Sequence, residues 1–169
     1  MTGRILDISG PLTAERIVKE MKRHKEKGKV LDIGSGRGEN VKVFRSYDYE
    51  TFGLDIRNAF DSSARGLSTR ATVMRMPFGE SAFDVVTESL MYSQAFEIDK
   101  WLDAEYRTSL REIKRVLAPS GILISSWAQG SGLIRATGMS KVHRHALEVG
   151  LRPLPSKDRS ILVFERPLE

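Results

Sequence analysis

Two features of this sequence suggest chemistry. One is a set of alternate glycines that follows an apolar run, and the other is an acidic residue that follows the next apolar run. The apolar residues 30–33 lead into Gly34, Gly36 and Gly38. Glycine is needed where the backbone turns sharply or lies against a ligand, because a Cβ would block both. Asp55 follows the second apolar run, and a carboxylate there can accept hydrogen bonds from ribose hydroxyls. This pattern is typical of the nucleotide-binding half of a doubly wound α/β sheet.

The spacing of the glycines separates two kinds of nucleotide ligand. The loop has the pattern G-x-G-x-G, whereas the dinucleotide fingerprint is G-x-G-x-x-G. Asp32 stands two residues before Gly34, still in the apolar run. Its carboxylate can bind an ammonium group but is a poor neighbour for a pyrophosphate. The loop therefore favours a nucleoside that carries a cationic amino-acid tail, which describes S-adenosylmethionine (SAM).

Four segments, in the same order, resemble class I SAM-dependent methyltransferases, and the small type 11 methyltransferases most closely. They read VLDIGSGRG at 30–38, GLDI at 53–56, MPFGESAFDVV at 76–86 and LREIKRVLAPSG at 110–121. The resemblance covers about residues 28 to 127. Four ordered motifs are far more specific than a single glycine-rich loop.

The resemblance implies a Rossmann-like α/β fold, a three-layer sandwich. Its sheet would be mostly parallel, with seven strands in the order 3-2-1-4-5-7-6 and an antiparallel last strand. It also implies that SAM is the cofactor and predicts what each site residue does. Asp32, Gly34 and Gly36 would hold the methionyl part, Asp55 the ribose, Ile56 one adenine face, and backbone groups near Met74 and Arg75 the adenine edge. The acid that the family often has before the 76–86 motif is missing from residues 71–75.

Glu88 ends the predicted fourth strand, where ligands of open α/β sheets bind. We include it in the predicted cofactor site, and a plain surface acid is the alternative.

Hydrophobic periodicity predicts alternating helices and strands, as in a parallel three-layer sheet. Thr13 is the predicted N-cap of a first helix that runs to about residue 27, where Gly28 ends it. Further helices are predicted over 39–46, 58–64, 103–117 and 140–149. Strands are predicted over 51–54, 70–74, 83–88, 122–127 and 161–164, and residues 4–8 as a short strand or a docked arm.

The 169 residues fit one domain. We divide it into an N-terminal arm and basic helix (1–28), a SAM-binding core (29–127) and a C-terminal helix and strands (128–169).

The absence of cysteine excludes disulfides, cysteine-ligated metals and a cysteine nucleophile. No apolar run is long enough to span a bilayer, and the first residues lack a signal-peptide pattern. The predicted compartment is therefore the cytoplasm.

Positive charge is concentrated in residues 16–29, which contain seven Lys or Arg and only two Glu. The net charge of this segment, +5, equals the formal net charge of the whole chain. One interpretation is a solvated helix face. The other is a binding patch for nucleic acid, formed by Lys19, Lys22, Arg23, Lys25, Lys27 and Lys29.

The methyl acceptor should lie over residues 89–104 and 127–139, which follow the fourth and fifth strands. Met91, Tyr92, Phe96, Trp101 and Trp127 can form an aromatic wall there or belong to the core. Residues 88–91 lack the (Asn/Asp)-Pro-Pro-(Tyr/Phe) motif of enzymes that methylate amino groups of adenine, cytosine or glutamine.

His143 and His145 are interpreted as surface histidines, and no catalytic base is assigned. His24, His143 and His145 are scattered in the sequence, so no metal site is predicted.

Three functions remain open from the sequence. The first is a SAM-dependent methyltransferase acting on a small molecule, which we favour slightly over RNA or protein. The second is an NAD(P)-binding oxidoreductase, because Arg57 near Asp55 suits a phosphorylated ribose. The third is a non-catalytic partner subunit with a SAM-binding fold.

Overall fold

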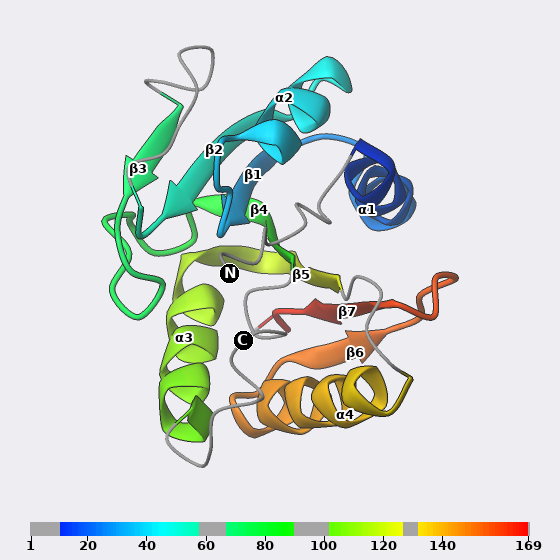
Figure 1. Ribbon diagram of the computed structural model, residues 1–169. Helices are drawn as coiled ribbons and strands as arrows, with labels where there is room; N and C mark the ends of the chain where they lie inside the picture. Colours follow the sequence, from blue (N-terminus) through cyan, green and yellow to red (C-terminus); the bar gives the residue numbers. More distant parts are fainter. Residues whose placement is uncertain (1–10, 58–66, 90–101, 127–131, 169) are drawn as a thin grey trace, which may run out of the picture.

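A seven-stranded sheet forms the centre of the chain in a computed structural model that describes residues 11–57, 67–89, 102–126 and 132–168. The strands follow one another across the sheet in the order β3-β2-β1-β4-β5-β7-β6 (Figure 1). Their bounds are β1 Lys29–Ile33, β2 Glu50–Asp55, β3 Ser68–Arg70, β4 Phe83–Ser89, β5 Leu117–Ser126, β6 Arg152–Leu154 and β7 Ile161–Glu165.

Strand direction confirms the fold that the resemblance implies. β1 pairs in parallel with β2 and β4, β2 with β3, and β4 with β5. β7 is antiparallel to both of its neighbours, β5 and β6. The carboxyl ends of β1, β2, β4 and β5 therefore lie along one edge of the sheet, called here the carboxyl edge, where ligands of such folds bind.

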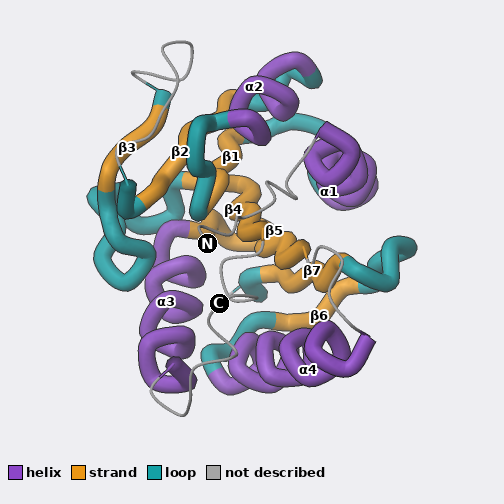
Figure 2. The backbone as a smooth tube through the Cα atoms, viewed as in Figure 1, coloured by secondary structure: helices purple, strands orange, loops and turns teal. Residues whose placement is uncertain are grey.

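Helices cover both faces of the sheet and complete the three layers. They are α1 Pro11–His24, α2 Glu39–Ser46, α3 Leu102–Val116 and α4 Gly132–Glu148. α1 and α2 lie on one face, and α3 and α4 lie on the other (Figures 1 and 2). Within the described residues, no helix combines the length and the apolarity needed to cross a membrane.

Successive residues of each strand point to opposite faces, so two separate cores form. Val30 and Val85 pack with α1 and α2, whereas Leu31 and Val86 pack with α3 and α4. Because both faces are covered, most residues of the central strands β1, β4 and β5 are buried, as is usual for a parallel sheet. Polar residues in the buried parts of these strands, such as Asp32 and Glu88, face the helices that their position in the alternation determines.

The first helix differs from the prediction at both ends. It begins at Pro11 and ends at His24, so Thr13 lies inside the helix and is not its N-cap. Proline is favoured in the first turn because its missing N–H would have no partner there. Gly28 has a φ of +143°, and a Cβ on it would lie 2.5 Å from a side-chain oxygen of Asp84. Gly28 therefore lets the chain pass Asp84 on its way into β1, four residues after the helix ends.

Other elements agree with the prediction more closely. α2 has the predicted bounds, β4 is longer by one residue at its end, and α3 both begins and ends one residue earlier than predicted. The third strand is shorter and earlier than predicted, because Thr72 and Arg75 close a tight turn instead of continuing β3. α4 begins eight residues before the predicted position 140. β6 was not separately predicted. The predicted arm at 4–8 and helix at 58–64 lie outside the described residues.

Candidate active site at the carboxyl edge

The glycine loop after β1 has the backbone that its sequence predicts. Gly34, Gly36 and Gly38 have φ angles of 71°, 54° and 88°, a region that side chains disfavour. The N–H of Gly34 donates to the carbonyl of Leu54 at 2.7 Å, which ties the loop to the end of β2. A Cβ on Gly36 would meet no heavy atom within 4 Å. Gly36 therefore faces open space at the carboxyl edge, where a ligand can approach its backbone.

Asp55, the last residue of β2, lies directly beside this loop. Its Oδ2 accepts a hydrogen bond from the Gly36 N–H at 2.9 Å, and its Oδ1 accepts one from the Arg57 N–H at 2.7 Å. The Arg57 side chain adds a 3.4 Å ion pair while remaining 74% exposed. A carboxylate has about four lone-pair sites. Asp55 therefore keeps capacity for hydroxyl donors from a ribose.

Asp32 is buried behind the loop, on the face covered by α1 and α2. Its Oδ1 accepts hydrogen bonds from the Thr87 hydroxyl at 2.8 Å and from the Asn40 amide at 3.4 Å. Its Oδ2 has no hydrogen-bond partner among the described residues. Burial raises the pKa of Asp32 to about 7, although the bonds from Thr87 and Asn40 act in the opposite direction. A buried carboxylate with a free oxygen is suited to a cationic ligand group.

Exposed apolar side chains lie where the resemblance implies the adenine. Ile56 is 67% exposed and Met74 39% exposed, so both side chains are accessible to a ligand. The backbone N–H groups of Met74 and Arg75 are less available to a ligand than predicted, because both donate hydrogen bonds within the turn. The N–H of Met74 donates to the Thr72 hydroxyl at 3.3 Å, and the N–H of Arg75 donates to the Thr72 carbonyl at 3.2 Å. Adenine recognition through Met74 and Arg75 would thus use groups other than these two N–H donors.

An ion pair on α3 fixes the segment that follows this turn. Arg115 donates to Glu112 at 2.7 Å and to the carbonyls of Phe78 at 2.9 Å and Met76 at 3.3 Å. Glu112 in turn accepts the N–H of Met76 at 2.8 Å. The Arg115 side chain lowers the pKa of Glu112. The motif at 110–121 therefore holds the motif at 76–86 in place, a function that the sequence analysis did not assign to it.

Glu88 lies on the other face of the sheet from Asp32. It pairs with Ile33 across β1 and β4, and its side chain is only 2% exposed. The Tyr106 hydroxyl of α3 donates to its Oε1 at 3.3 Å, while its Oε2 has no hydrogen-bond partner among the described residues. The alternative of a surface acid is therefore wrong. Burial raises the pKa of Glu88 to about 7, against hydrogen bonds from Ser125 and Tyr106.

Comparison with known proteins identifies the family of this chain. The model of a methyltransferase domain family matches residues 31–125, a range that contains the glycine loop, Asp55, Glu88 and the Glu112–Arg115 pair. The chain belongs to this methyltransferase family. The resemblance to class I SAM-dependent methyltransferases is thereby confirmed, and family membership sets the oxidoreductase alternative aside.

Relatives and structural neighbours agree with this assignment. A demethylmenaquinone methyltransferase of Thermus thermophilus is 27% identical over 135 residues, which is 73% of this chain but 58% of that protein. A SAM-dependent methyltransferase of Methanosarcina mazei has a TM-score of 0.70 at 16% identity, covering 89% of this chain and 98% of that one. A 1,6-didemethyltoxoflavin N1-methyltransferase of Burkholderia thailandensis, solved with its acceptor and S-adenosylhomocysteine (SAH), has a TM-score of 0.69 at 16% identity, covering 92% and 79%.

The histidines of this methyltransferase chain lie differently from the prediction. His145 is fully buried between α3 and α4, so its interpretation as a surface histidine is wrong. Its Nδ1 is 2.8 Å from Glu148, and its ring meets Tyr106 edge to face at 6.0 Å. His143 is half-buried against the ring of Phe164 at 5.8 Å. Among the described residues, no group of His, Asp or Glu has the arrangement of a metal site.

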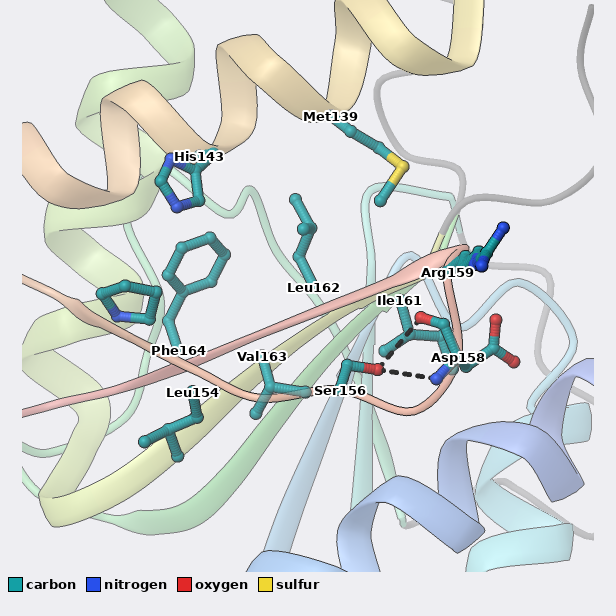
Figure 3. A pocket seen from close by; sticks show the side chains of 11 residues that line it. Met139, His143, Leu154, Ser156, Asp158, Arg159, Ile161, Leu162, Val163 and Phe164 are labelled. Atoms are coloured by element: carbon teal, nitrogen blue, oxygen red, sulfur yellow. Dashed lines mark hydrogen bonds between the residues drawn. The ribbon is translucent and has the colours of Figure 1, made fainter. Parts of the chain in front are cut away.

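A cavity of about 290 Å³ lies between α4 and the β6–β7 hairpin (Figure 3). Met139 and His143 project into it from α4, opposite Leu162 and Phe164 of β7. Its remaining lining residues are Pro153, Leu154, Ser156, Asp158, Arg159, Ile161 and Val163. The sequence analysis placed Met139 at the end of one predicted acceptor segment but did not predict the cavity.

The predicted aromatic wall lies outside the described residues. Its five candidates are Met91, Tyr92, Phe96, Trp101 and Trp127.

The predicted basic patch lies away from the carboxyl edge. α1 ends at His24 and leads into the amino end of β1 at Lys29, so Lys25, Lys27 and Lys29 lie near the opposite edge of the sheet. β1 separates Lys29 from the glycine loop by about 13 Å of strand. Three of the six patch residues are also engaged within the fold: Lys22 over the Tyr47 ring, Arg23 with Glu20, and Lys29 with Glu50.

Proposed function

We propose that this chain binds SAM at the carboxyl edge and transfers its methyl group to a small molecule. The observation that carries the proposal is the hydrogen bond between the glycine loop and Asp55, together with the buried Oδ2 of Asp32, which has no hydrogen-bond partner in the part of the chain that the structure describes. The proposed cofactor residues are those predicted from the sequence, namely Asp32, Gly34, Gly36, Asp55, Ile56, Met74 and Arg75. Glu88, the eighth, is considered separately below.

Each part of SAM has a matching group at this edge. The Asp32 carboxylate would attract the ammonium of the methionyl part, and it gains most from a cation because it is buried. The open backbone at Gly36 would let the methionyl part approach closely. Asp55 would accept hydrogen bonds from the ribose, and the exposed Ile56 would cover one face of the adenine. SAM supplies a methyl group that is already activated by the sulfonium charge.

The protein's part in such a reaction is mainly alignment. Holding the acceptor atom in line with the methyl carbon and the sulfur removes most of the entropic cost of the reaction. A base is needed only where the acceptor atom must lose a proton. The rigid carboxyl edge, fixed by the Gly34–Leu54 and Gly36–Asp55 hydrogen bonds, is suited to this alignment.

Two features support a small molecule as the acceptor. The cavity under α4 is at the lower end of the volumes found for ligand pockets, about 300 Å³. One end of it lies near the carboxyl end of β5, because its lining residue Ile161 of β7 pairs with Ser126, the last residue of β5. Lys25, Lys27 and Lys29 of the basic patch, in contrast, lie near the opposite edge, so RNA bound there would have to extend along the molecule to present a base to the cofactor.

The names of the relatives support the same acceptor class. The Thermus thermophilus protein acts on demethylmenaquinone, and the Burkholderia thailandensis protein acts on 1,6-didemethyltoxoflavin. Both names identify a small molecule and not RNA or protein. The chain spans 58% of the length of the Thermus thermophilus relative, so we carry over the class of acceptor and not the acceptor itself. The cytoplasm remains the predicted compartment.

Transfer of label from SAM tests the proposal. The purified chain is incubated with [methyl-³H]SAM and a cell extract, which is then separated into small-molecule, RNA and protein fractions. We expect label in the small-molecule fraction. Label mainly in RNA or protein would contradict the acceptor class. SAM binding without label in any fraction would indicate a non-catalytic partner subunit.

A further inference from the structure

Glu88 combines burial, a free carboxylate oxygen and a central position at the carboxyl edge. The Tyr106 hydroxyl of α3 donates to Oε1 of the carboxyl group at 3.3 Å, and Ser125 is the residue paired with Glu88 on the neighbouring strand β5. Its Oε2 has no hydrogen-bond partner among the described residues. A buried carboxylate is costly unless a partner satisfies it, so this free oxygen indicates a ligand group.

Strand register places Glu88 in line with the cavity under α4. Glu88 pairs with Ser125 across β4 and β5, and Ser125 pairs with Leu162 across β5 and β7. Residues paired across neighbouring strands point to the same face. The three side chains therefore form a row on the face covered by α3 and α4, and Leu162 lines the cavity (Figure 3). Two strand spacings, about 10 Å, separate the ends of the row.

Asp32 belongs to a different environment, although the two carboxylates are one residue apart in register. It pairs with Thr87 and shares the face covered by α1 and α2. The glycine loop and Asp55 are on the β1–β2 side of the carboxyl edge. Glu88 lies one strand further toward β5 and β7. It is thus placed between the proposed cofactor residues and the proposed acceptor cavity.

We propose that Glu88 is the catalytic residue that takes up the proton released by the methyl acceptor, whose apolar part lies in the cavity beside Leu162. This inference rests on the proposed function. It moves Glu88 from the cofactor site, where the sequence analysis placed it, to the acceptor side. The acceptor class is a small molecule with an N–H, O–H or acidic C–H group at one end of an apolar body.

The proposed step balances without any further reactant. The acceptor atom forms a bond to the methyl carbon while the bond from that carbon to sulfur breaks, and its electron pair stays on sulfur to give SAH. A nitrogen or oxygen acceptor attacks with its lone pair and keeps the electron pair of its bond to hydrogen, whereas a carbon acceptor attacks with the electron pair of its C–H bond. In each case the proton passes to Glu88 Oε2, directly or through one water. The sulfonium loses its positive charge as Glu88 loses its negative charge. Tyr106, which donates to Oε1, positions the carboxyl group for this step.

The experiment compares Glu88→Gln with the wild-type chain in the label-transfer assay, using [methyl-³H]SAM and total cell extract. Glu20→Gln is the matched control, because Glu20 is also buried and also has an oxygen without a hydrogen-bond partner among the described residues, but it lies on α1. Calorimetry with SAM and SAH measures cofactor affinity for each variant. Transfer is followed from pH 5.5 to pH 9, because Glu88 must be ionised to accept a proton. In the described part of the chain, Tyr106 of α3 is a titratable group in contact with Glu88, and His145 of α4 contacts the Tyr106 ring.

We expect Glu88→Gln to lower transfer about 100-fold, to change SAM affinity less than threefold, and to lose the acidic limb of the wild-type pH profile. Glu20→Gln should retain the wild-type rate and profile. Met139→Trp, which fills the cavity, should lower transfer with SAM affinity unchanged. Three results would overturn the inference: Glu88→Gln retaining a third or more of the wild-type transfer, losing more than tenfold in SAM affinity, or keeping the acidic limb. A wild-type chain that labels no fraction would instead contradict the proposed function, and the inference with it.

Discussion

The backbone N–H of Gly36 donates a 2.9 Å hydrogen bond to the Asp55 carboxylate, joining the loop after β1 to the end of β2. This hydrogen bond connects the two sequence motifs that contain these residues. Asp55 would thus have two functions, one in the structure of the loop and one toward the proposed ribose.

Replacing Asp55 separates these two functions. Asp55→Ala removes both the acceptor for the Gly36 N–H and the acceptors for the ribose, and SAH affinity should fall about 30-fold or more. Asp55→Asn keeps an oxygen acceptor for the Gly36 N–H, so a smaller loss is expected. Calorimetry with SAH measures both. Unchanged affinity in Asp55→Ala would contradict the ribose assignment.

A second pair of variants separates contact with the ligand from general strain. Gly36→Val places a branched side chain in the open space at the carboxyl edge and should abolish SAH binding. Gly150→Val is the control, since Gly150 also has a positive φ, of +80°, and a Cβ there would lie 3.2 Å from only the end of the Lys114 side chain. Gly150→Val should carry a similar backbone strain and bind SAH as the wild-type chain does. Equal SAH affinity in the two variants would exclude Gly36 from the site.

The pKa of Asp32 predicts how SAM binding depends on pH. Burial raises this pKa to about 7, so the carboxylate loses its charge as the pH falls below 7. SAM affinity should therefore decrease between pH 8 and pH 6, approaching tenfold per pH unit below the pKa. Asp32→Asn should bind SAM more weakly at pH 8 and lose this pH dependence. A wild-type affinity that is constant over this range would contradict the contact between Asp32 and the ammonium group.

Glu88→Gln should make the fold more stable at high pH. Burial raises the Glu88 pKa from 4.5 to about 7, so the folded state disfavours the charge that the unfolded chain accepts freely. The cost is absent below about pH 4.5, grows as the pH rises toward 7, and is constant above it. Glu88→Gln should therefore raise the free energy of unfolding by about 1 to 3 kcal/mol at pH 8 and leave it unchanged near pH 4. Denaturant unfolding at the two pH values measures this difference, and a destabilised variant at pH 8 would contradict it.

Arg115→Met should weaken both the fold and SAM binding, because Arg115 holds the carbonyls of Met76 and Phe78. The loss should be about 1 to 3 kcal/mol in the free energy of unfolding and about threefold to tenfold in SAM affinity. Arg111→Met is the control on the same helix, where Arg111 is exposed. If SAM affinity is unchanged in Arg115→Met while stability falls, the ion pair is structural and does not position the adenine segment.

Much of the fold could be predicted because its signals are local. The apolar run into Gly34, Gly36 and Gly38 required a strand followed by a tight loop, and the structure has both. Elements were misplaced where a local signal competed with packing. Thr13 has the chemistry of an N-cap, but Pro11 starts α1 two residues earlier.

Within the site, only the residues that belong to a sequence motif could be predicted. Asp32 and Asp55 were found because each stands at a fixed place relative to the glycine loop. The partners of Asp32, namely Thr87 and Asn40, come from other elements, and nothing in their local sequence connects them to it. The burial of His145 and Glu88 depends on how α3 and α4 cover the sheet. Strand register, which aligned Glu88 with Leu162, becomes visible only in three dimensions.

The basic patch should not contribute to methyl transfer. Lys25 and Lys27 follow α1 near the edge of the sheet opposite the glycine loop, and Lys19 lies on α1 itself. The triple replacement by Gln should leave label transfer and SAM affinity within twofold of the wild-type values, because these charges only increase the solubility of the helix. RNA binding is measured in parallel at several salt concentrations, since phosphate contacts weaken steeply with salt. Tight RNA binding at physiological salt that the triple variant loses would support a nucleic-acid acceptor instead.

Calorimetric titration of the wild-type chain with SAM, SAH and NADPH tests the central claim most directly. The account predicts one binding site per chain for SAM and for SAH, competition between these two ligands, and no heat from NADPH. It also predicts that Glu20→Gln, with its replacement on α1, binds SAM as the wild-type chain does. Absence of binding for both SAM and SAH, or saturable binding of NADPH at the same site, would contradict the account.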